Sequence, residues 1–202
     1  MKLEIPEGPF GAYIFDCDGT LADSMPIHYA AFLKAFDHLG IDIELSEEVY
    51  YGLAGVPVAE FAQYLEKKFR TEIDSHQLDE VKSKYYRESL DQIQPVQAVV
   101  ELLKNTVGKL PIAVASGGTR HCVNRTLKII GIEDLVDAVV TAEDVQRGKP
   151  APDIFLKSAE LLGVDPKGCL VFEDAALGIK AAHAAGMQTV HVETHPYANS
   201  AW

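Results

Sequence analysis

The chain has 202 residues, of which 48% are hydrophobic, and a formal net charge of −12 at pH 7, which together fit one acidic domain with or without a modest insertion. The negative charge argues against a nucleic-acid partner, because phosphate backbones bind positively charged protein faces. No apolar run approaches the ~20 residues of a membrane span, and the N-terminus lacks the apolar stretch of a signal peptide, so we expect a cytoplasmic protein that binds no membrane.

Several short apolar segments are typical of buried strands, because each is only four or five residues long and is bounded by polar or turn residues. The stretches between them carry helical patterns. This alternation predicts an α/β fold with a Rossmann-like core, in which helices cover a parallel sheet. The expected strands are 12–15, 112–116, 138–141, 170–174 and 189–192.

The stretch between the first two expected strands is far longer than the dozen or so residues that a simple crossover requires, so we expect an insertion there. We predict a discontinuous α/β catalytic core over 1–23 and 94–202 and an inserted α-helical cap over 24–93. Pro95 is expected to stop the last helix of the insertion. The expected cap helices are 26–39, 46–51, 57–69 and 75–93.

Two acidic residues directly follow the first expected strand, in the sequence YIFDCDGTL. Asp16 and Asp18 are two residues apart, so in extended backbone both carboxylates project to the same side. Such a pair can divide the work of phosphoryl transfer, because one carboxylate can attack phosphorus while the other protonates the leaving oxygen and later activates water. The alternative is a polar turn whose acids cap the helix that follows.

A second polar motif, VASGGTR, follows the expected strand 112–116. Ser116 and the backbone N–H groups of the next turn, which begins at Gly117, are suited to holding phosphate oxygens. Arg120 adds a positive charge that suits an anionic substrate. The alternatives are a plain helix N-cap for the serine and an ordinary exposed arginine.

Two more motifs place charged residues before helices at the same edge of the sheet. GKPAPD holds Lys149 in a proline-stiffened loop, where an ammonium group can neutralise a nucleophile and the transferring phosphoryl group. VFEDA ends a strand with Glu173 and Asp174, whose hard oxygen atoms suit Mg²⁺. Most surface lysines have no such role, and the two acids can instead complement a helix dipole. Because parallel strands end at one edge of a sheet, we expect these side chains to lie together.

The ordered motifs DCDGTL, VASGG, GKPAPDIF and FEDAALGIKAAHAAGM resemble the haloacid dehalogenase superfamily, and within it the β-phosphoglucomutase-like phosphatases. The resemblance covers nearly the whole chain. It implies that Asp16 is the nucleophile and that Asp18 is the general acid/base, with its backbone carbonyl facing a metal. It also implies that Ser116 and Lys149 hold the phosphoryl group.

The same resemblance implies a cofactor and further substrate contacts. His28, at the cap hinge, is expected to touch the substrate or assist closure, although a helix-surface histidine is the alternative. Gly117 and Arg120 are expected on the substrate side, as in relatives that act on sugar and polyol phosphates. The cofactor is expected to be Mg²⁺, and the residues around it Asp16, Asp18, Glu173 and Asp174.

The resemblance therefore implies a magnesium-dependent phosphatase that hydrolyses a small phosphorylated metabolite, a sugar or polyol phosphate, through an aspartyl-phosphate on Asp16. The main alternative is a phosphosugar mutase of the β-phosphoglucomutase type. Such mutases carry a lysine and an arginine in the cap loop where this chain has Ala54 and Val58, which favours the phosphatase. A phospho-receiver signalling module is disfavoured, because here the acceptor follows the first strand and a helical insertion comes next.

The remaining expectations concern the cysteines, the C-terminus and assembly. Cys17, Cys122 and Cys169 are odd in number and lie in no metal-ligand spacing, which fits free thiols in a reducing compartment. Cys17 alternates with the two aspartates and is expected to pack in the core. The segment after Val192 lacks periodicity and is expected to be a tail, and the protein is expected to be a monomer.

Overall fold

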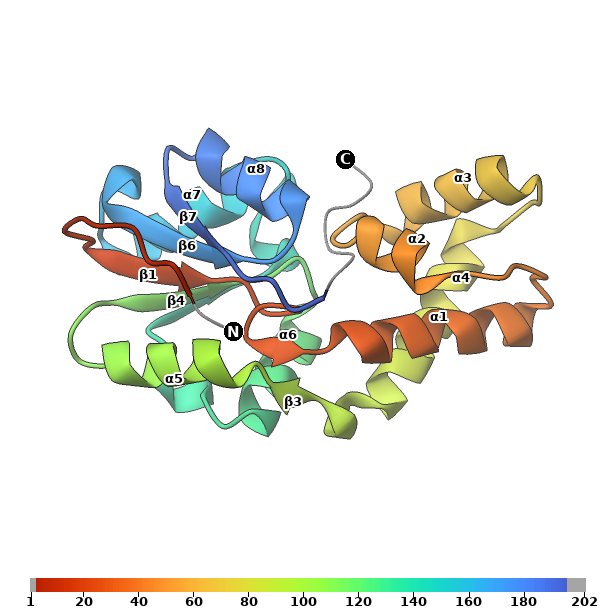
Figure 1. Cartoon of the computed structure of the whole chain (residues 1–202), viewed down its shortest axis with the longest axis horizontal. Coiled ribbons are helices and arrows are strands. Elements are labelled where there is room, and N and C mark those ends of the chain that lie inside the picture. Colours follow the sequence, from red (N-terminus) through yellow and green to blue (C-terminus); the bar gives the residue numbers. More distant parts are fainter. Residues whose placement is uncertain (1–2, 196–202) are drawn as a thin grey trace.

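The computed structural model describes residues 3–195 and contains a parallel sheet whose strand order is β5-β4-β1-β6-β7 (Figure 1). Every pairing within this sheet is parallel, so the carboxyl ends of its strands meet at one edge. The predicted α/β fold is therefore confirmed. The strands are β1 (Ala12–Phe15), β4 (Ile112–Ala115), β5 (Ala138–Val140), β6 (Cys169–Glu173) and β7 (Gln188–His191).

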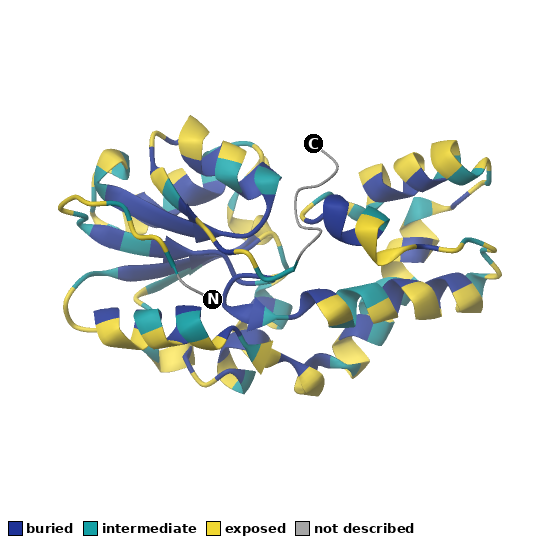
Figure 2. Cartoon of the chain, in the orientation of Figure 1, coloured by how far each residue is buried: buried dark blue, intermediate teal, exposed yellow. Residues whose placement is uncertain are grey.

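Helices cover both faces of the sheet because alternate strand residues face two separate apolar clusters. In β1, Phe15 packs on the side of α5 and α6, and Ile14 packs on the side of α7 and α8. The central strand is thus buried on both faces, as expected for a parallel sheet (Figure 2). The helices are α5 (Gln97–Thr106), α6 (Arg120–Ile129), α7 (Asp153–Leu162) and α8 (Ala176–Ala184), and short 3₁₀ turns occupy Leu90–Gln92, Glu133–Leu135, Ala142–Asp144 and Pro166–Gly168.

The stretch between β2 (Ala22–Asp23) and β3 (Gln94–Pro95) is helical, as predicted, and lies to one side of the sheet (Figure 1). Its four helices share an apolar cluster of their own, in which the rings of Phe32 and Phe61 lie 4.8 Å apart. The side chains of Ser46 and Asp74 accept hydrogen bonds from the first turns of α2 and α4, so local sequence fixes where these helices begin. The helices are α1 (Met25–Leu39), α2 (Glu47–Gly52), α3 (Val58–Phe69) and α4 (Ser75–Glu88), and we keep the name cap for residues 24–93.

The chain returns from the cap differently from the single long helix predicted over 75–93. Helix α4 ends at Glu88, and a 3₁₀ turn then leads into the two-residue strand β3 (Gln94–Pro95). β3 pairs with β2 (Ala22–Asp23), so the two segments that connect core and cap lie side by side. A helix could not continue through Gln94, because the residue before a proline is driven out of the α conformation.

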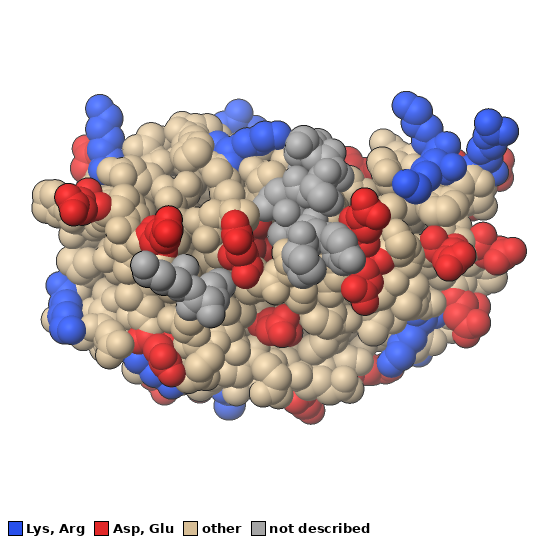
Figure 3. Space-filling view, viewed as in Figure 1, with Lys and Arg blue, Asp and Glu red and all other residues tan. Residues whose placement is uncertain are grey.

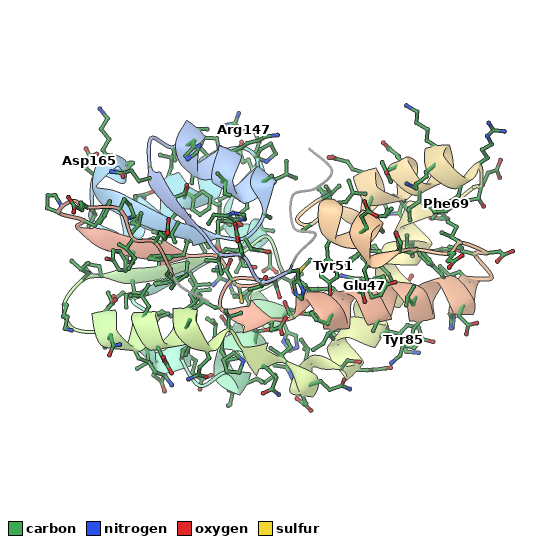
Figure 4. The ribbon with its side chains drawn as sticks, viewed as in Figure 1. Glu47, Tyr51, Phe69, Tyr85, Arg147 and Asp165 are labelled. Carbon is green, nitrogen blue, oxygen red and sulfur yellow. The ribbon has the colours of Figure 1, made fainter. Side chains whose placement is uncertain are left out.

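The cap also contacts the core at its inner edge. Ala175, which precedes α8, belongs to the apolar cluster of the cap. Tyr51 of α2 lies where the cap faces the core (Figure 4), and its ring stacks on that of His195 with centroids 4.3 Å apart. The residues beyond His195, which include most of the predicted tail, lie outside the described part of the chain.

The surface carries the negative charge of the sequence. On the face shown in Figure 3, Asp and Glu side chains are scattered over core and cap, and Lys and Arg gather at the edges. Within residues 3–195, no helix has both the length and the apolar character needed to cross a bilayer.

Candidate active site

The predicted motifs meet at the carboxyl edge of the sheet. Asp16 follows β1, Ser116 follows β4, and Glu173 and Asp174 lie at the end of β6; all four side chains are buried. They line a cavity of about 490 Å³ whose opposite wall is formed by the cap. Lys149, His28 and Gly117 line the same cavity, so most of the predicted site lies around one space.

Lys149 links the two acidic strand ends. Its ammonium group donates to Oδ1 of Asp16 at 2.6 Å, to Oε1 of Glu173 at 2.7 Å and to the carbonyl oxygen of Ala115 at 3.2 Å. Burial opposes the charge on Lys149, but these two carboxylates outweigh it and raise the pKa of the ammonium group. The lysine is therefore a fixed positive charge beside the predicted nucleophile.

Glu173 is held by both of its carboxylate oxygens. Oε1 accepts from Lys149, and Oε2 accepts at 2.7 Å from the backbone N–H of Ala175 at the start of α8. A Cβ atom on Gly178 would overlap this carboxylate, so the close approach depends on glycine at that position of α8. Glu173 therefore fixes Lys149 in addition to lying in the predicted metal group.

Three carboxylates form a group that fits a divalent cation. Asp16, Glu173 and Asp174 each offer an oxygen atom, and these atoms all lie within 4.8 Å of one another. Burial is the main cause that raises the pKa of Asp16, to about 7, although Lys149 counteracts it. Burial, followed by the charges of Glu173 and Asp16, also raises the pKa of Asp174. A hard cation such as Mg²⁺ suits these oxygen donors and offsets the cost of crowding ionised acids together.

Asp18 has a different set of partners from Asp16. Its Oδ1 accepts from the hydroxyl groups of Ser24 at 2.6 Å and of Tyr86 at 3.2 Å, and Nε2 of His28 lies 3.6 Å away. Burial opposes ionisation of Asp18, but His28, Ser24 and Tyr86 outweigh it and lower the pKa of its carboxyl group. Asp16 thus contacts Lys149 of the core, whereas Asp18 contacts residues of the cap.

A chain of contacts continues from His28 into the cap. Its ring stacks on that of Tyr86 with centroids 3.7 Å apart, and Nδ1 lies 2.8 Å from the ammonium group of Lys82. Burial, followed by the charge of Lys82, lowers the pKa of His28 to about 4. A neutral ring with its proton on Nε2 can accept from Lys82 and point that proton at Asp18. The predicted hinge position of His28 therefore brings it to Asp18.

The serine motif forms a compact loop. The backbone N–H of Ser116 donates to the carbonyl oxygen of Val140 at 3.0 Å, and its hydroxyl oxygen accepts from the N–H of Gly118 at 3.0 Å. A Cβ atom on Gly118 would lie 3.3 Å from that hydroxyl oxygen and 3.8 Å from Oδ2 of Asp18. The loop backbone therefore runs close to both groups, which fits binding of a compact anion.

Arg120 lies apart from the cavity. Its guanidinium group pairs with Asp144 and donates to the carbonyl oxygen of Val139 at 3.5 Å, while its backbone N–H donates to Glu143 at 2.9 Å. These contacts tie the start of α6 to the 3₁₀ turn after β5. The structure gives Arg120 no contact with the cavity, so its predicted role in substrate binding receives no support.

Some residues of the site were not predicted. Lys82, Ser24 and Tyr86 reach Asp18 or His28 from the hinge and cap, and Thr20 donates to Oδ1 of Asp174 at 3.1 Å. Thr20 lies in the quoted DCDGTL motif, which offered a way to find it. Lys82 lies in a helix with other charged residues, and nothing in the spacing marks it.

Comparison with known proteins decides the family. A family model described as haloacid dehalogenase-like hydrolase matches residues 13–192. The chain belongs to this family. It is 36% identical over 184 residues to fructose-1-phosphate phosphatase YqaB of Escherichia coli, covering 91% of this chain and 96% of that one. It is 30% identical over 188 residues to the phosphorylated carbohydrates phosphatase of Thermotoga maritima, covering 91% and 85%.

Solved structures of this hydrolase family share the fold. β-Phosphoglucomutase from Clostridium difficile is 29% identical with a TM-score of 0.75, covering 89% of this chain and 83% of that one. A family hydrolase from Deinococcus radiodurans, solved with bound phosphate and sodium, is 26% identical with a TM-score of 0.72, covering 94% and 84%. These matches confirm the predicted superfamily and the prediction of a phosphoric monoester hydrolase.

Proposed function

We propose that this hydrolase is a magnesium-dependent phosphatase that acts on a sugar or polyol phosphate through an aspartyl-phosphate on Asp16. The observation that carries the proposal is the unlike surroundings of the two aspartates. Asp16 lies against Lys149 in the core, and Asp18 is held by Ser24 and Tyr86 from the hinge and cap. This difference supports attack by Asp16 and proton transfer by Asp18 to or from a group in the cavity.

In the first step, an oxygen atom of Asp16 attacks phosphorus, and the bond from phosphorus to the leaving oxygen breaks. Ser116, Lys149 and the backbone N–H groups from Gly117 onward hold the phosphoryl oxygens. Asp18 gives its proton to the leaving oxygen, which departs as an alcohol. Although the pKa of Asp18 is lowered in the free enzyme, a phosphoryl dianion bound beside it raises that pKa, so the acid form becomes accessible.

In the second step, Asp18 takes a proton from water, and the water oxygen attacks the phosphorus of the aspartyl-phosphate. The acyl phosphate bond breaks, inorganic phosphate leaves and the carboxylate of Asp16 is restored. The lowered pKa of Asp18 favours this base role. Asp16 and Asp174, with Glu173 beside them, would hold Mg²⁺, which when bound neutralises charge on the transferring phosphoryl group.

The substrate class is supported by relatives and by the cap loop. Two relatives are named as phosphatases of fructose 1-phosphate and of phosphorylated carbohydrates. The structural similarity to a β-phosphoglucomutase keeps a mutase as the second candidate. Ala54 and Val58 line the cavity at the positions where the resembling mutases carry a lysine and an arginine. Without these two cations the loop is less suited to retaining a bisphosphate, which favours hydrolysis.

The test is a panel of sugar, polyol and glycolytic phosphates, measured for phosphate release with Mg²⁺ and with EDTA. A coupled assay for isomerisation of hexose 1-phosphate to 6-phosphate, with and without a hexose bisphosphate, runs alongside. We expect multiple-turnover phosphate release that EDTA abolishes and added Mg²⁺ restores. Isomerisation without phosphate release would show that the protein is a mutase and contradict the proposed phosphatase activity. Unchanged phosphate release in EDTA would contradict the proposed dependence on Mg²⁺.

A further inference from the structure

A loop of the cap forms an apolar part of the cavity wall. Residues 53–58, with the sequence LAGVPV, line it without a charged or hydroxyl-bearing side chain. Phe32, Tyr50 and Phe61 line the same wall; the rings of Phe32 and Phe61 pack 4.8 Å apart, and that of Tyr50 lies 5.9 Å from Phe32. All three rings are buried and belong to the apolar cluster of the cap, so this wall is part of a packed core.

Both lysines that line the described cavity contact other side chains of the site, outside the loop 53–58. Among the described residues that line the cavity, the lysines are Lys82 and Lys149, and no arginine takes part. Lys149 is bound to Asp16 and Glu173. Lys82 lies 2.8 Å from Nδ1 of His28, and its ammonium group is 5.2 Å from the ring centroids of both Phe32 and Tyr86. Neither lysine extends from the loop 53–58, where the far end of a substrate would rest.

A second anionic group in this cavity would therefore be unfavourable. It would lose its hydration against residues 53–58 without gaining a charged partner from that loop, and an unpaired buried charge is costly. Apart from Lys149, the core side offers no cation either, because the other titratable side chains that it adds to the described lining are the acids Asp16, Asp18, Glu173 and Asp174. An uncharged polyol or sugar has no such penalty, and its C–H faces can pack on apolar and aromatic side chains.

We propose that the cap wall selects phosphate monoesters whose remaining part is uncharged and rejects both bisphosphates and phosphates that carry a carboxylate. This inference rests on the proposed phosphatase function and narrows its substrates. Residues 53–58 are the segment that determines specificity, because they disfavour a substrate that carries a second negative charge.

The test uses two matched pairs of phosphates that differ in one charged group. Fructose 1-phosphate is compared with fructose 1,6-bisphosphate, and glycerol 3-phosphate with 3-phosphoglycerate, by kcat/KM at fixed Mg²⁺ and ionic strength. We expect kcat/KM for the charged member of each pair to be at least about 100-fold lower. Equal values within either pair would overturn the inference while leaving the phosphatase function intact.

A variant then tests whether the wall itself is responsible. Val58→Lys places a cation on the wall and should raise kcat/KM for fructose 1,6-bisphosphate relative to fructose 1-phosphate by at least about tenfold. Val107→Lys is the matched control, since Val107 is exposed at the end of α5, outside the cavity lining. Pro57→Lys, at an exposed position of the same wall, repeats the test if Val58→Lys misfolds. An unchanged ratio in a folded wall variant would overturn the inference.

Failure of the proposed function gives a different pattern. If none of the four compounds is hydrolysed, the phosphatase proposal fails, and selectivity is then measured as binding of the same compounds by calorimetry. Tighter binding of the uncharged member of each pair supports the inference. Equal or tighter binding of the charged member overturns it.

Discussion

Glu173 keeps its place because position 178 has no side chain. Its carboxylate lies where a Cβ atom of residue 178 would be, and from there it holds Lys149 at 2.7 Å. Within a helix, glycine is less stable than alanine by about 1 kcal/mol, so helix propensity alone would favour alanine in α8. The glycine is instead required by the packing of Glu173, which connects a backbone position to the charge beside the proposed nucleophile.

We predict that Gly178→Ala lowers kcat by about tenfold to 100-fold, because Glu173 must move and Lys149 loses one of its two carboxylate partners. Overpacking should also reduce the free energy of unfolding by about 1–3 kcal/mol. Gly168→Ala is the control, since a Cβ atom there would meet Val164 at an ordinary 3.5 Å. Steady-state kinetics and thermal unfolding of both variants provide the measurement. Wild-type kcat in Gly178→Ala would show that Glu173 does not position Lys149.

Residue positions were predictable from sequence where a strand end fixes them. Asp16, Ser116 and Asp174 each follow an apolar strand, and parallel pairing brings such ends together. Lys82 could not be found in this way, because its contact with His28 exists only where α4 packs on α1. Arg120 was expected at the site from its place in the serine motif, but its side chain pairs with Asp144 after β5, outside the cavity lining.

Among the elements, the segment after β7 connects parts of the site that are distant in sequence. The hydroxyl group of Thr194 donates to the carbonyl oxygen of Gly19 at 3.1 Å, next to Asp18. The ring of His195 stacks on Tyr51 of the cap, and its Nε2 lies 3.4 Å from Oδ1 of Asp23 in the hinge strand β2. This segment therefore contacts the loop after β1, the strand β2 and the cap together.

We predict that His195→Ala raises KM about fivefold with little change in kcat, because an aromatic contact of about 1 kcal/mol that holds the cap near the core is lost. The control is His183→Ala, whose ring contacts Thr189 on the core surface at 3.2 Å. Both constants are measured for each variant with one substrate. A fall in kcat at constant KM would place His195 in the chemical step, contrary to this account.

The limits of prediction are clearest in the connecting elements. The strands and the first three cap helices were predictable within one residue at either end, because apolar runs mark the strands and a proline or a side-chain cap marks the start of each helix. The end of α4 and the pairing of β2 with β3 were not predictable. Two-residue strands carry no periodicity, and the pairing of Asp23 with Gln94 depends on the cap folding back to its starting point.

At the scale of the whole molecule, the three cysteines differ in how far they are buried. All three thiols are free; Cys17 and Cys169 are fully buried, and Cys122 is partly exposed. Burial is the main cause that raises the pKa of the Cys17 thiol and raises that of Cys169 to about 11, which disfavours the reactive thiolate. The predicted core position of Cys17 agrees with this burial.

We predict that a thiol reagent modifies Cys122 in the native protein and reaches all three cysteines after denaturation. The measurement is a colorimetric thiol titration with and without denaturant, followed by mass spectrometry of the modified peptides. Cys122→Ser is the control and should leave native labelling close to zero. Rapid native modification of Cys17 would contradict the tight packing around β1.

The central claim, that Asp16 forms a covalent bond to phosphorus, is tested most directly by replacing this carboxylate with an amide of nearly equal size. Phosphate release from the best substrate of the panel is measured with Mg²⁺ for wild-type enzyme, Asp16→Asn and the control Asp165→Asn, whose aspartate caps a turn at the far end of the core (Figure 4). The account predicts multiple turnover in wild type and the control and a loss of at least ~10³ in Asp16→Asn. A folded Asp16→Asn enzyme that releases phosphate at the wild-type rate would contradict it.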